Sequence, residues 1–280
     1  MLGDTQRTLG AEELFLGREQ NEAERRALIE KIATEEHPAF VVHLGDMVAF
    51  GASAEQWQYF DRLMSPLRAR QVPIFAVLGN HDLWGGRRAA VRRAGRRFPE
   101  LAHGGPYARR HRGLGLVWLN SNLEGSLGLR QAEWFEQTLR VFDVDPATRA
   151  VLVFMHHPAY TNGKHRYAEP YVVEQLLPRF LVAKKALVLM SGHVHGYERF
   201  CAQSRTFVVS GGGGGPRVEY AIGGDAAYPP AYVTETGQSR PLNYVVVESE
   251  PSRLRFTVKC LPQGASCPDG IVERFSVGLH

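Results

Sequence analysis

Hydrophobic and polar positions alternate in blocks along the first two-thirds of the chain. Short continuous apolar runs, which are typical of buried parallel strands, are separated by longer segments with helical spacing. The apolar runs predict strands over residues 39–44, 74–78, 115–119, 150–155 and 186–190. The longer segments predict helices over residues 18–36, 54–70, 130–140 and 168–181. This alternation predicts an α/β fold built on a parallel sheet.

The last third of the chain changes to a β-rich pattern. It predicts strands over residues 206–209, 244–248, 253–259 and 272–277, with Gly/Pro turns between them. No Pro/Ser-rich or charge-blocked linker divides the sequence, so we expect a single domain over residues 1–280. Two packed, mixed β-sheets flanked by helices fit the whole pattern, and residues 200–280 are expected to belong to the second sheet.

Composition and charge limit the classes of function. The chain has 280 residues with 44% hydrophobic and 22% charged residues, an ordinary globular composition. No stretch approaches the roughly 20 apolar residues that span a bilayer. The net charge of +4 comes largely from arginines in residues 86–98 and 108–113. Such clusters either attract phosphates or form a solvated helix face, and the lack of interleaved aromatic residues argues against a nucleic-acid partner.

Three cysteines are too few for a disulfide scaffold. Cys260 and Cys267 flank a Pro/Gly-containing turn, so they are placed to form a loop-closing bridge if the protein is exported. The sequence opens on MLGDTQ, inside its first strand, so an export leader would lie upstream of this chain. We favour an exported or periplasmic location on this spacing, and we expect Cys201 to be a buried hydrophobic residue.

Polar side chains stand where nearly every predicted parallel strand ends. Because the carboxyl ends of strands in an open α/β sheet converge on the binding crevice, we expect these side chains to meet. They are Asp4 and Gln6, then Asp46, then Asn80, His81 and Asp82, then His156 and His157, and finally His193 and His195.

This set of side chains suits a pair of metal ions. Carboxylates and neutral imidazoles bind Mn, Fe, Zn or Co, and the absence of clustered cysteines argues against a thiolate site. A bridging carboxylate can hold two ions about 3.5–4 Å apart. In an extended segment His193 and His195 project from the same side, so each can serve a different ion. The strand ends therefore predict a dinuclear metal centre.

The motifs at these strand ends carry a family resemblance. The series GD, GD, GNHD, H and GHVH, in this order between Asp4 and residues 211–215, resembles the calcineurin-like metallophosphoesterase superfamily. HHPAYTNG and GHVHGYER resemble its purple-acid-phosphatase branch. The resemblance implies a four-layer αββα sandwich and two divalent or trivalent metal ions. It implies the following metal ligands: Asp46 as the bridge, Asn80, His156 and His193 for the second ion, and Asp4 and His195 for the first.

The resemblance also implies catalytic and substrate-binding residues. His81, oriented by Asp82, matches the family residue that contacts the phosphate and protonates the leaving group. His165 matches a second histidine on the substrate side of purple-type enzymes. Asn80, His157, Arg87 and Arg88 complete the expected substrate contacts, and His157 is equally well explained as a turn residue or as support for a ligand.

Two positions depart from the family pattern. Gln6 stands where most of the superfamily has a histidine, and a neutral amide oxygen is a weaker metal ligand than an imidazole. Ala49 stands where the purple enzymes have a tyrosine, so the Fe(III) charge-transfer centre is not expected. We therefore expect the first metal to bind loosely.

Other motifs near the strand ends have simpler explanations. Glu198 and Arg199 either brace the ligand histidines or form a surface ion pair of little energetic value. The glycine run at residues 211–215 lacks the Lys and Ser/Thr of a P-loop, so we expect it to pack beside the metal site. His43, inside an apolar strand, is expected in the core, and His103 and His111 at the surface.

The sequence predicts a metal-dependent phosphoric ester hydrolase. In this mechanism a metal-activated hydroxide attacks the phosphorus of a phosphomonoester or phosphodiester, on a phosphorylated small molecule or a phosphoprotein. The alternative is a metallophosphoesterase-fold binding protein with an impaired first metal site and little turnover. A nuclease ranks below both, because no separate DNA-binding module is visible in the sequence.

Overall fold

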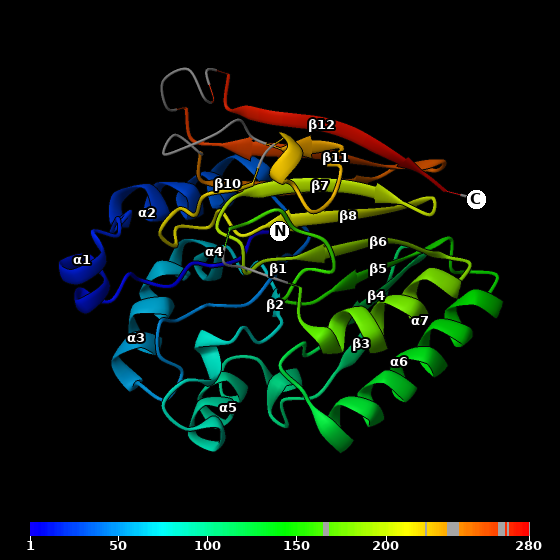
Figure 1. Cartoon of the computed structure of the whole chain (residues 1–280), viewed down its shortest axis with the longest axis horizontal. Coiled ribbons are helices and arrows are strands. Elements are labelled where there is room, and N and C mark those ends of the chain that lie inside the picture. The colour runs from blue at the N-terminus through cyan, green and yellow to red at the C-terminus, as the bar shows by residue number, and fades with distance from the viewer. Residues whose placement is uncertain (165–167, 222, 234–240, 263–266, 268, 280) are drawn as a thin grey trace.

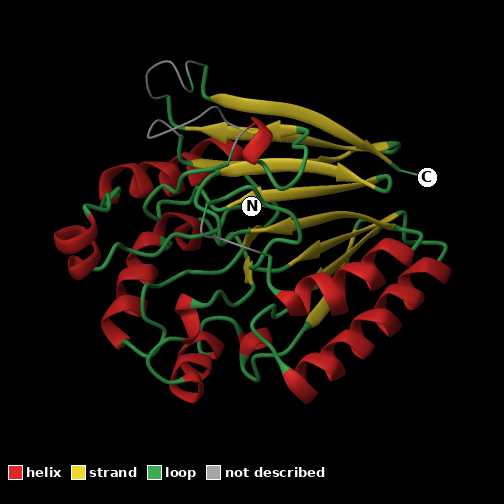
Figure 2. Cartoon of the chain, in the orientation of Figure 1, coloured by secondary structure: helices red, strands yellow, loops and turns green. Residues whose placement is uncertain are grey.

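Two β-sheets lie face to face in the middle of the molecule, and helices cover their outer sides (Figure 1, Figure 2). The computed structural model describes the whole chain except residues 165–167, 222, 234–240, 263–266, 268 and 280. The four layers match the predicted α/β sandwich. Among the described residues, no helix is both long and apolar enough to cross a membrane.

The larger sheet is mixed and has seven strands among the described residues. In spatial order they are β3 (Tyr107–His111), β4 (Leu114–Trp118), β5 (Ala150–Phe154), β6 (Ala186–Ser191), β8 (Arg205–Ser210), β7 (Tyr197–Ala202) and β9 (Tyr232–Val233). Strands β4, β5, β6 and β8 are parallel, whereas β3 and β7 pair antiparallel with their neighbours. The carboxyl ends of the parallel strands therefore open at one edge.

The second sheet consists of a strand pair, β1 (Val41–His43) and β2 (Ile74–Ala76), and a strand triplet, β10 (Asn243–Ser249), β11 (Arg253–Cys260) and β12 (Ile271–Gly278). The first two residues of the chain lie between the pair and the triplet and join them. The Leu2 backbone N–H donates to the Val42 carbonyl (3.1 Å), and the Val245 N–H donates to the Met1 carbonyl (2.8 Å). Met1–Leu2 thus places Asp4 beside the ends of β1 and β6.

Helices lie on the two outer sides of the sheets. They are α2 (Glu22–Lys31), α3 (Ala54–Leu63), α4 (Ser65–Ala69), α5 (Arg87–Gly95), α6 (Gly125–Val144) and α7 (Leu177–Val182). A further short helix, α1 (Gly10–Leu16), exposes its apolar side chains. Phe135 of α6 and Phe180 of α7 pack against the larger sheet. Leu28 of α2 and Phe60 of α3 pack against the second sheet. Between the sheets, Trp118, Phe154 and Val42 belong to one buried cluster.

Most predicted elements are present, and the differences have identifiable causes. The strand predicted at 206–209 is β8, which pairs with β6 in the larger sheet, so the C-terminal contribution to the second sheet begins only at Asn243. Residues 108–113 were expected as an arginine cluster or helix face. They instead supply most of the edge strand β3, because alternate side chains along an edge can remain in water.

The predicted helices are shorter or interrupted. The segment expected over 54–70 divides at Met64, before Pro66, and the segment over 168–181 contains a π-type turn, Val172–Leu176, before α7 and its Pro178. Proline lacks the N–H that a continuous helix needs. By contrast, α6 extends the predicted 130–140 helix at both ends.

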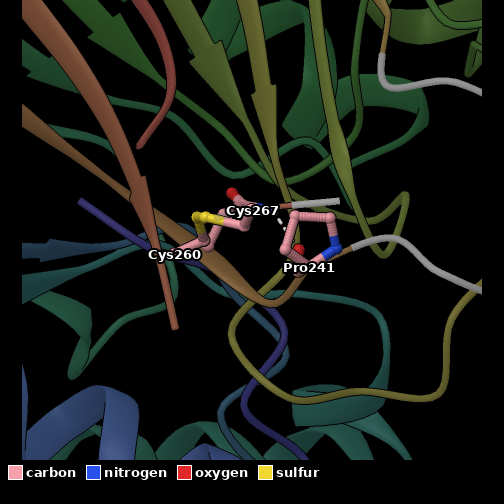
Figure 3. Close-up of a disulfide and its surroundings, with 4 residues drawn as sticks. Pro241, Cys260 and Cys267 are labelled. Atoms are coloured by element: carbon pink, nitrogen blue, oxygen red, sulfur yellow. Dashed lines mark hydrogen bonds between the residues drawn. A yellow bond between two sulfur atoms is a disulfide. The ribbon is translucent and has the colours of Figure 1, made fainter. Parts of the chain in front are cut away.

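The cysteines also fall into two cases. Cys260 at the end of β11 forms a disulfide with Cys267, beside Pro241 (Figure 3), as the spacing predicts. Cys201 is exposed, so the expectation of a buried residue is wrong. It follows Phe200 in β7, and because side chains alternate along a strand, Phe200 enters the core while Cys201 faces solvent.

Candidate metal centre

The predicted metal ligands meet at the carboxyl ends of the strands, in loops that are almost completely buried. Their exposed fractions are 0% for Asp4, 1% for Asp46, 0% for His156, 8% for His193 and 3% for His195. Asp4, Asp46 and His193 have positive φ angles of 63°, 53° and 70°. Such angles are uncommon outside glycine, so backbone strain is concentrated at three predicted ligands.

Three donor atoms converge in what we call the second cluster, formed by Asn80, His156 and His193. His156 Nε2 lies 3.0 Å from Asn80 Oδ1 and 3.2 Å from His193 Nδ1, and the latter two atoms are 3.2 Å apart. His156 Nδ1 is 2.9 Å from the Leu44 carbonyl, so its proton is held there and Nε2 presents a lone pair. Several lone pairs facing one another are what a cation would stabilise.

The first cluster comprises Asp4, Gln6 and His195. His195 Nε2 lies 3.4 Å from Asp4 Oδ1, and His195 Nδ1 lies 2.6 Å from the Pro216 carbonyl, which again leaves Nε2 free of its proton for a metal. One end of the Gln6 amide lies 3.2 Å from His195 Nε2. When that end is the oxygen, the amide nitrogen donates to the carbonyls of Asp4 and Asp46. In either orientation the Gln6 side chain reaches the first cluster.

Asp46 lies between the two clusters. Its Oδ2 is 3.4 Å from His156 Nε2, while Asp4, Asp46 and His195 bring ligand atoms within 4.8 Å of one another. Its Oδ1 accepts a hydrogen bond from the His81 backbone N–H at 2.9 Å. One carboxylate therefore faces both sets of donors, the geometry that a bridging ligand needs.

The electrostatics of the clusters favour a positive charge. Burial alone would lower the pKa of His156, but the carboxylates of Asp46 and Asp4 raise it to about 9. Burial alone would raise the pKa of Asp46, but His156, His81 and His193 hold it well below its usual range. A site that attracts a proton so strongly also attracts a metal cation, and its O and N donors fit Mn, Fe, Zn or Co.

The imidazole of His81 is positioned differently from the prediction. Its Nδ1 lies 3.1 Å from the Ala49 carbonyl, and its ring lies over Trp84 with 3.8 Å between centroids. Asp82 does not orient this ring. Its carboxylate accepts instead from the backbone N–H groups of Met47 and Val48 (2.9 and 3.1 Å) and of Gly79 (2.9 Å). Asp82 therefore joins the loop after β1 to the turn after β2.

The environment of Asp82 also affects its ionisation. Burial and the charge of Asp46 raise its pKa to about 8, while the N–H groups of Gly79 and Val48 favour the carboxylate against that shift. This buried side chain fixes two ligand-bearing loops to each other. Its role is to support Asp46 and Asn80.

His157 faces a hollow beside the second cluster. Its Nδ1 is 2.9 Å from Ser121 Oγ, and Ser121 Oγ in turn accepts from the His157 backbone N–H at 3.0 Å. Ser121 therefore holds the ring at Nδ1, and Nε2 lies 4.0 Å from Glu169. The hollow measures about 560 Å³, and Asn80, His157 and Arg87 line it.

Other predicted residues lie elsewhere. Arg88 lines a neighbouring surface groove rather than this hollow. His165 lies outside the described residues. His43 is fully buried, 2.9 Å from Thr5 Oγ1, and burial lowers its pKa to about 3, as expected of a neutral core histidine.

Glu198 and Arg199 do not pair with each other, so the predicted ion pair between them is wrong. Glu198 is buried and accepts from the Thr161 hydroxyl (2.6 Å) and the Asn162 N–H (2.8 Å). Arg199 pairs with Glu273 across to β12 (2.5 Å). Adjacent strand residues point to opposite faces, which separates the two side chains.

The glycine run packs beside the first cluster, as predicted. The N–H groups of Gly213 and Gly215 donate to the carbonyls of Gly3 and Asp4, and the Gly211 N–H donates to Gly196. A side-chain Cβ on Gly211 would lie 2.8 Å from Asp4 Oδ2. Because these N–H groups already bond to backbone carbonyls, they do not form a phosphate cradle.

One strand end was overlooked in the sequence. The strand predicted at 115–119 is followed by NSN, and Ser121 and Asn122 line the hollow beside His157. The same strand-end rule that predicts Asp46 and Asn80 applies to this strand. Trp84, by contrast, carries no sequence signal, because its contact with His81 depends on the fold of the turn.

Comparison with known proteins gives consistent results. Residues 1–197 match the family described as calcineurin-like phosphoesterase. A probable purple acid phosphatase 20 of Arabidopsis thaliana is 26% identical in an alignment of length 199 that covers 62% of this chain and 43% of that protein. The chain therefore spans less than half the length of this relative.

Solved structures share the fold. A purple acid phosphatase from yellow lupin seeds has a TM-score of 0.76 at 20% identity, covering 99% of this chain and 52% of that one. GAP50, the anchor in the inner membrane complex of Plasmodium, has a TM-score of 0.72 at 16% identity, covering 100% of this chain and 87% of that one. At these identities the likeness concerns the fold alone.

Proposed function

Because this chain belongs to the calcineurin-like phosphoesterase family, we propose that it is a metal-dependent phosphoric ester hydrolase with a dinuclear centre. Its substrates would be phosphomonoesters or phosphodiesters. The observation that carries the proposal is the convergence of two donor clusters on Asp46, with His156 Nε2, Asn80 Oδ1 and His193 Nδ1 mutually within 3.2 Å.

Each metal ion would have its own ligands in this chain. Asn80, His156 and His193 would hold one ion, Asp4, His195 and Gln6 the other, and Asp46 both. When bound, two such ions would supply Lewis-acid activation of water and neutralise charge on the phosphoryl group. Carbonyl contacts from Leu44 and Pro216 hold Nδ1 of His156 and His195, so that Nε2 is the nitrogen that would face a metal.

His81 would handle the leaving group. With its Nδ1 proton on the Ala49 carbonyl and its ring against Trp84, its Nε2 is the atom available to contact a substrate oxygen. An imidazole in that place can donate a proton to a departing alkoxide or phenoxide. His157 would add a second N–H donor at the side of the hollow, oriented by Ser121.

The direct test is hydrolysis of a small aryl phosphate by the chain after chelation and reloading with Mn, Fe, Zn or Co. We expect saturable hydrolysis that chelation abolishes and metal restores. His156→Ala should lose it, whereas His37→Ala, at an exposed position before β1, should retain it. Metal bound to the ligands without any rate above buffer, for all four metals, would sink the proposal and favour the binding-protein alternative.

That alternative has one observation in its favour. Gln6 offers a neutral amide where an imidazole would bind metal more strongly, so the first site is the weaker one. GAP50, described as an anchor, shares the fold. The hydrolase remains the better proposal, because Asp4 and His195 still face Gln6 and Asp46 in a buried cluster.

We also propose that the protein acts in an oxidising compartment, outside the cytosol. The support is the Cys260–Cys267 disulfide, since such bridges persist in oxidising environments. Mass spectrometry of alkylated protein from its native cells should find this pair protected. Both cysteines alkylated without reduction would contradict it.

A further inference from the structure

One face of helix α5 concentrates positive charge at the surface. Arg87, Arg88, Arg92 and Arg96 are exposed there, and the last three repeat at intervals of four residues. At 1.5 Å per residue, their backbone positions follow one another about 6 Å apart along the helix. This set of four is called the arginine face below.

The opposite side of the same helix is fixed to the protein. Ala90 and Ala94 are buried, Arg93 Nε donates to the Ala52 carbonyl (2.9 Å), and Arg97 pairs with Asp61 (2.5 Å). Arg93 therefore belongs to the structural side of the helix. The arginine face is displayed by a helix that is held in place from behind.

The arginine face differs from most arginines of this protein. Among the described residues, no carboxylate lies within ion-pair distance of its four members. Many other arginines have a carboxylate partner: Arg18, Arg25, Arg26, Arg68, Arg97, Arg109, Arg110, Arg140, Arg179, Arg199, Arg217, Arg253 and Arg255. The four positive charges repel one another, and an anion bound among them would reduce this electrostatic repulsion.

The arginine face forms one wall of a groove. The groove measures about 650 Å³, and Ala102 and His103 line it together with the four arginines, Val91 and Gly95. A Cβ on Gly95 would lie 2.6 Å from the Ala102 Cα, so the glycine permits the close approach of the two walls. The groove is therefore a shaped recess with cationic groups along its length.

The groove and the hollow beside the metal centre share a lining residue. Arg87 lines both, and in the hollow it stands with Asn80 and His157. An extended anion could reach from the groove past Arg87 toward the second cluster.

We propose that the arginine face binds a second anionic group of the substrate, and that the substrate is a small phosphate ester with at least one further phosphate on its leaving part. The guanidinium fork matches phosphate oxygens in pairs, which makes arginine the suited residue. This inference rests on the proposed function for the identity of the substrate, whereas anion binding in the groove does not depend on hydrolysis.

A small polyphosphorylated ligand fits better than a nucleic acid. The arginine face extends only about 12 Å from Arg88 to Arg96, and residues 102 and 103 line the groove beside it. Single-strand binders add aromatic side chains on which bases stack, and the described lining of the groove contains no Phe, Tyr or Trp.

The test measures binding of inorganic tripolyphosphate to the metal-free full chain by calorimetry. The triple variant Arg88→Gln, Arg92→Gln, Arg96→Gln should bind about tenfold more weakly than wild type, and Arg92→Gln alone about twofold. The matched control Arg62→Gln, Arg70→Gln, Arg274→Gln removes the same charge from exposed arginines elsewhere, one of them on β12 across the molecule from α5 (Figure 1). It should bind as wild type does.

Equal binding by wild type and the triple variant would overturn the proposal, as would an equal loss in the control variant. Tighter binding of a single-stranded oligonucleotide than of tripolyphosphate would overturn the choice of a small ligand.

A second experiment tests whether the groove contributes to substrate binding. Wild type should have a KM for a bisphosphorylated ester about tenfold below that for a monophosphorylated one, and the triple variant should lose this preference. If tripolyphosphate binds the arginine face but neither ester is hydrolysed, the proposed function fails while the anion site stands. If both esters are hydrolysed with equal KM by wild type, the substrate assignment fails while the hydrolase stands.

Discussion

The two donor clusters share Asp46 but differ in composition. The second cluster has two imidazoles and an amide oxygen within 3.2 Å of one another, and the His157 ring lies beside them with its centroid 4.5 Å from that of His193. The first cluster has a single imidazole, a carboxylate and the amide of Gln6, with the His195–Asp4 contact at 3.4 Å. Donor chemistry therefore favours tighter metal binding at the second cluster.

The comparison shows that one fold can support two metal sites whose ligand residues differ. Both clusters have the same architectural support: a carbonyl fixes each ligand histidine, and left-handed turns aim Asp4, Asp46 and His193 inward. Within the first cluster, Gln6 is the side chain that departs from the family pattern. A change in that residue should therefore act on one ion and leave the other.

The largest effect is expected where the clusters join. Asp46→Asn removes the negative charge that faces both, so metal content should fall at both sites and hydrolysis should drop by more than about a hundredfold. Substitution of residues that merely orient a metal ligand lowers metal affinity or activity about 10–100-fold, and loss of the shared ligand should lower them further. Elemental mass spectrometry and the aryl phosphate rate measure this. Asp61→Asn is the matched control, and retained dinuclear binding in Asp46→Asn would contradict the bridging role.

A glycine change should damage the first cluster selectively. A Cβ on Gly192 would lie 2.5 Å from Asp4 Oδ2 and 2.9 Å from the Leu44 carbonyl, so Gly192→Ala forces Asp4 to move. We expect a loss of about 1–3 kcal/mol in unfolding free energy and about 10–100-fold weaker binding of the first ion.

Thermal unfolding and metal titration test the glycine change. Gly105→Ala, at a position where a Cβ meets nothing within 4 Å, controls for the substitution itself. Equal weakening of both ions in Gly192→Ala would show that the clusters do not act separately.

Restoring an imidazole should strengthen the weaker cluster. Gln6 is almost fully buried, and a histidine of similar size would direct a ring nitrogen toward His195 and Asp46. Gln6→His should bind the first ion about tenfold more tightly, since one good ligand is gained. Calorimetric titration with Mn measures it, and unchanged affinity would mean that the amide already serves as well as an imidazole.

Much of this site could be predicted from the sequence, because strand-end position is a local signal. Asp4, Asp46, Asn80, His156 and His193 each follow an apolar run, and parallel strands bring such ends together. The partners of Asp82 and Glu198 could not be predicted in this way. They are backbone groups of distant loops, and their contacts depend on how those loops turn rather than on residue type.

The fold shows the same division. Continuous apolar runs identify β1, β2, β4, β5 and β6, which are buried in the larger and second sheets. β3 was missed because Arg109 and Arg110 make an edge strand resemble a solvated segment. The sheet to which β8 belongs follows from pairing with β6, which local pattern does not encode.

The smallest effect is expected outside both clusters. Asp61 pairs with Arg97 and Arg68, which lower its pKa although partial burial alone would raise it. Asp61→Asn should cost less than about 1 kcal/mol, because the pair is solvent-screened. The lowered pKa means that the wild-type advantage is present above the ordinary carboxyl pKa and disappears as pH falls through the lowered one.

Urea unfolding from pH 7 down to acid measures the pH dependence of the Asp61 contribution. The unfolding free energies of wild type and Asp61→Asn should become equal at low pH. A difference that persists there would assign the effect to packing rather than to charge.

A calorimetric titration of the chelator-treated chain with Mn, with metal per chain counted by elemental mass spectrometry at the end point, decides whether both clusters hold metal. We expect close to two ions per chain in two distinguishable events, with the tighter one lost in His156→Ala and the weaker one strengthened in Gln6→His. A single event with close to one ion per chain, unaffected by Gln6→His, would contradict the claim that both clusters hold metal.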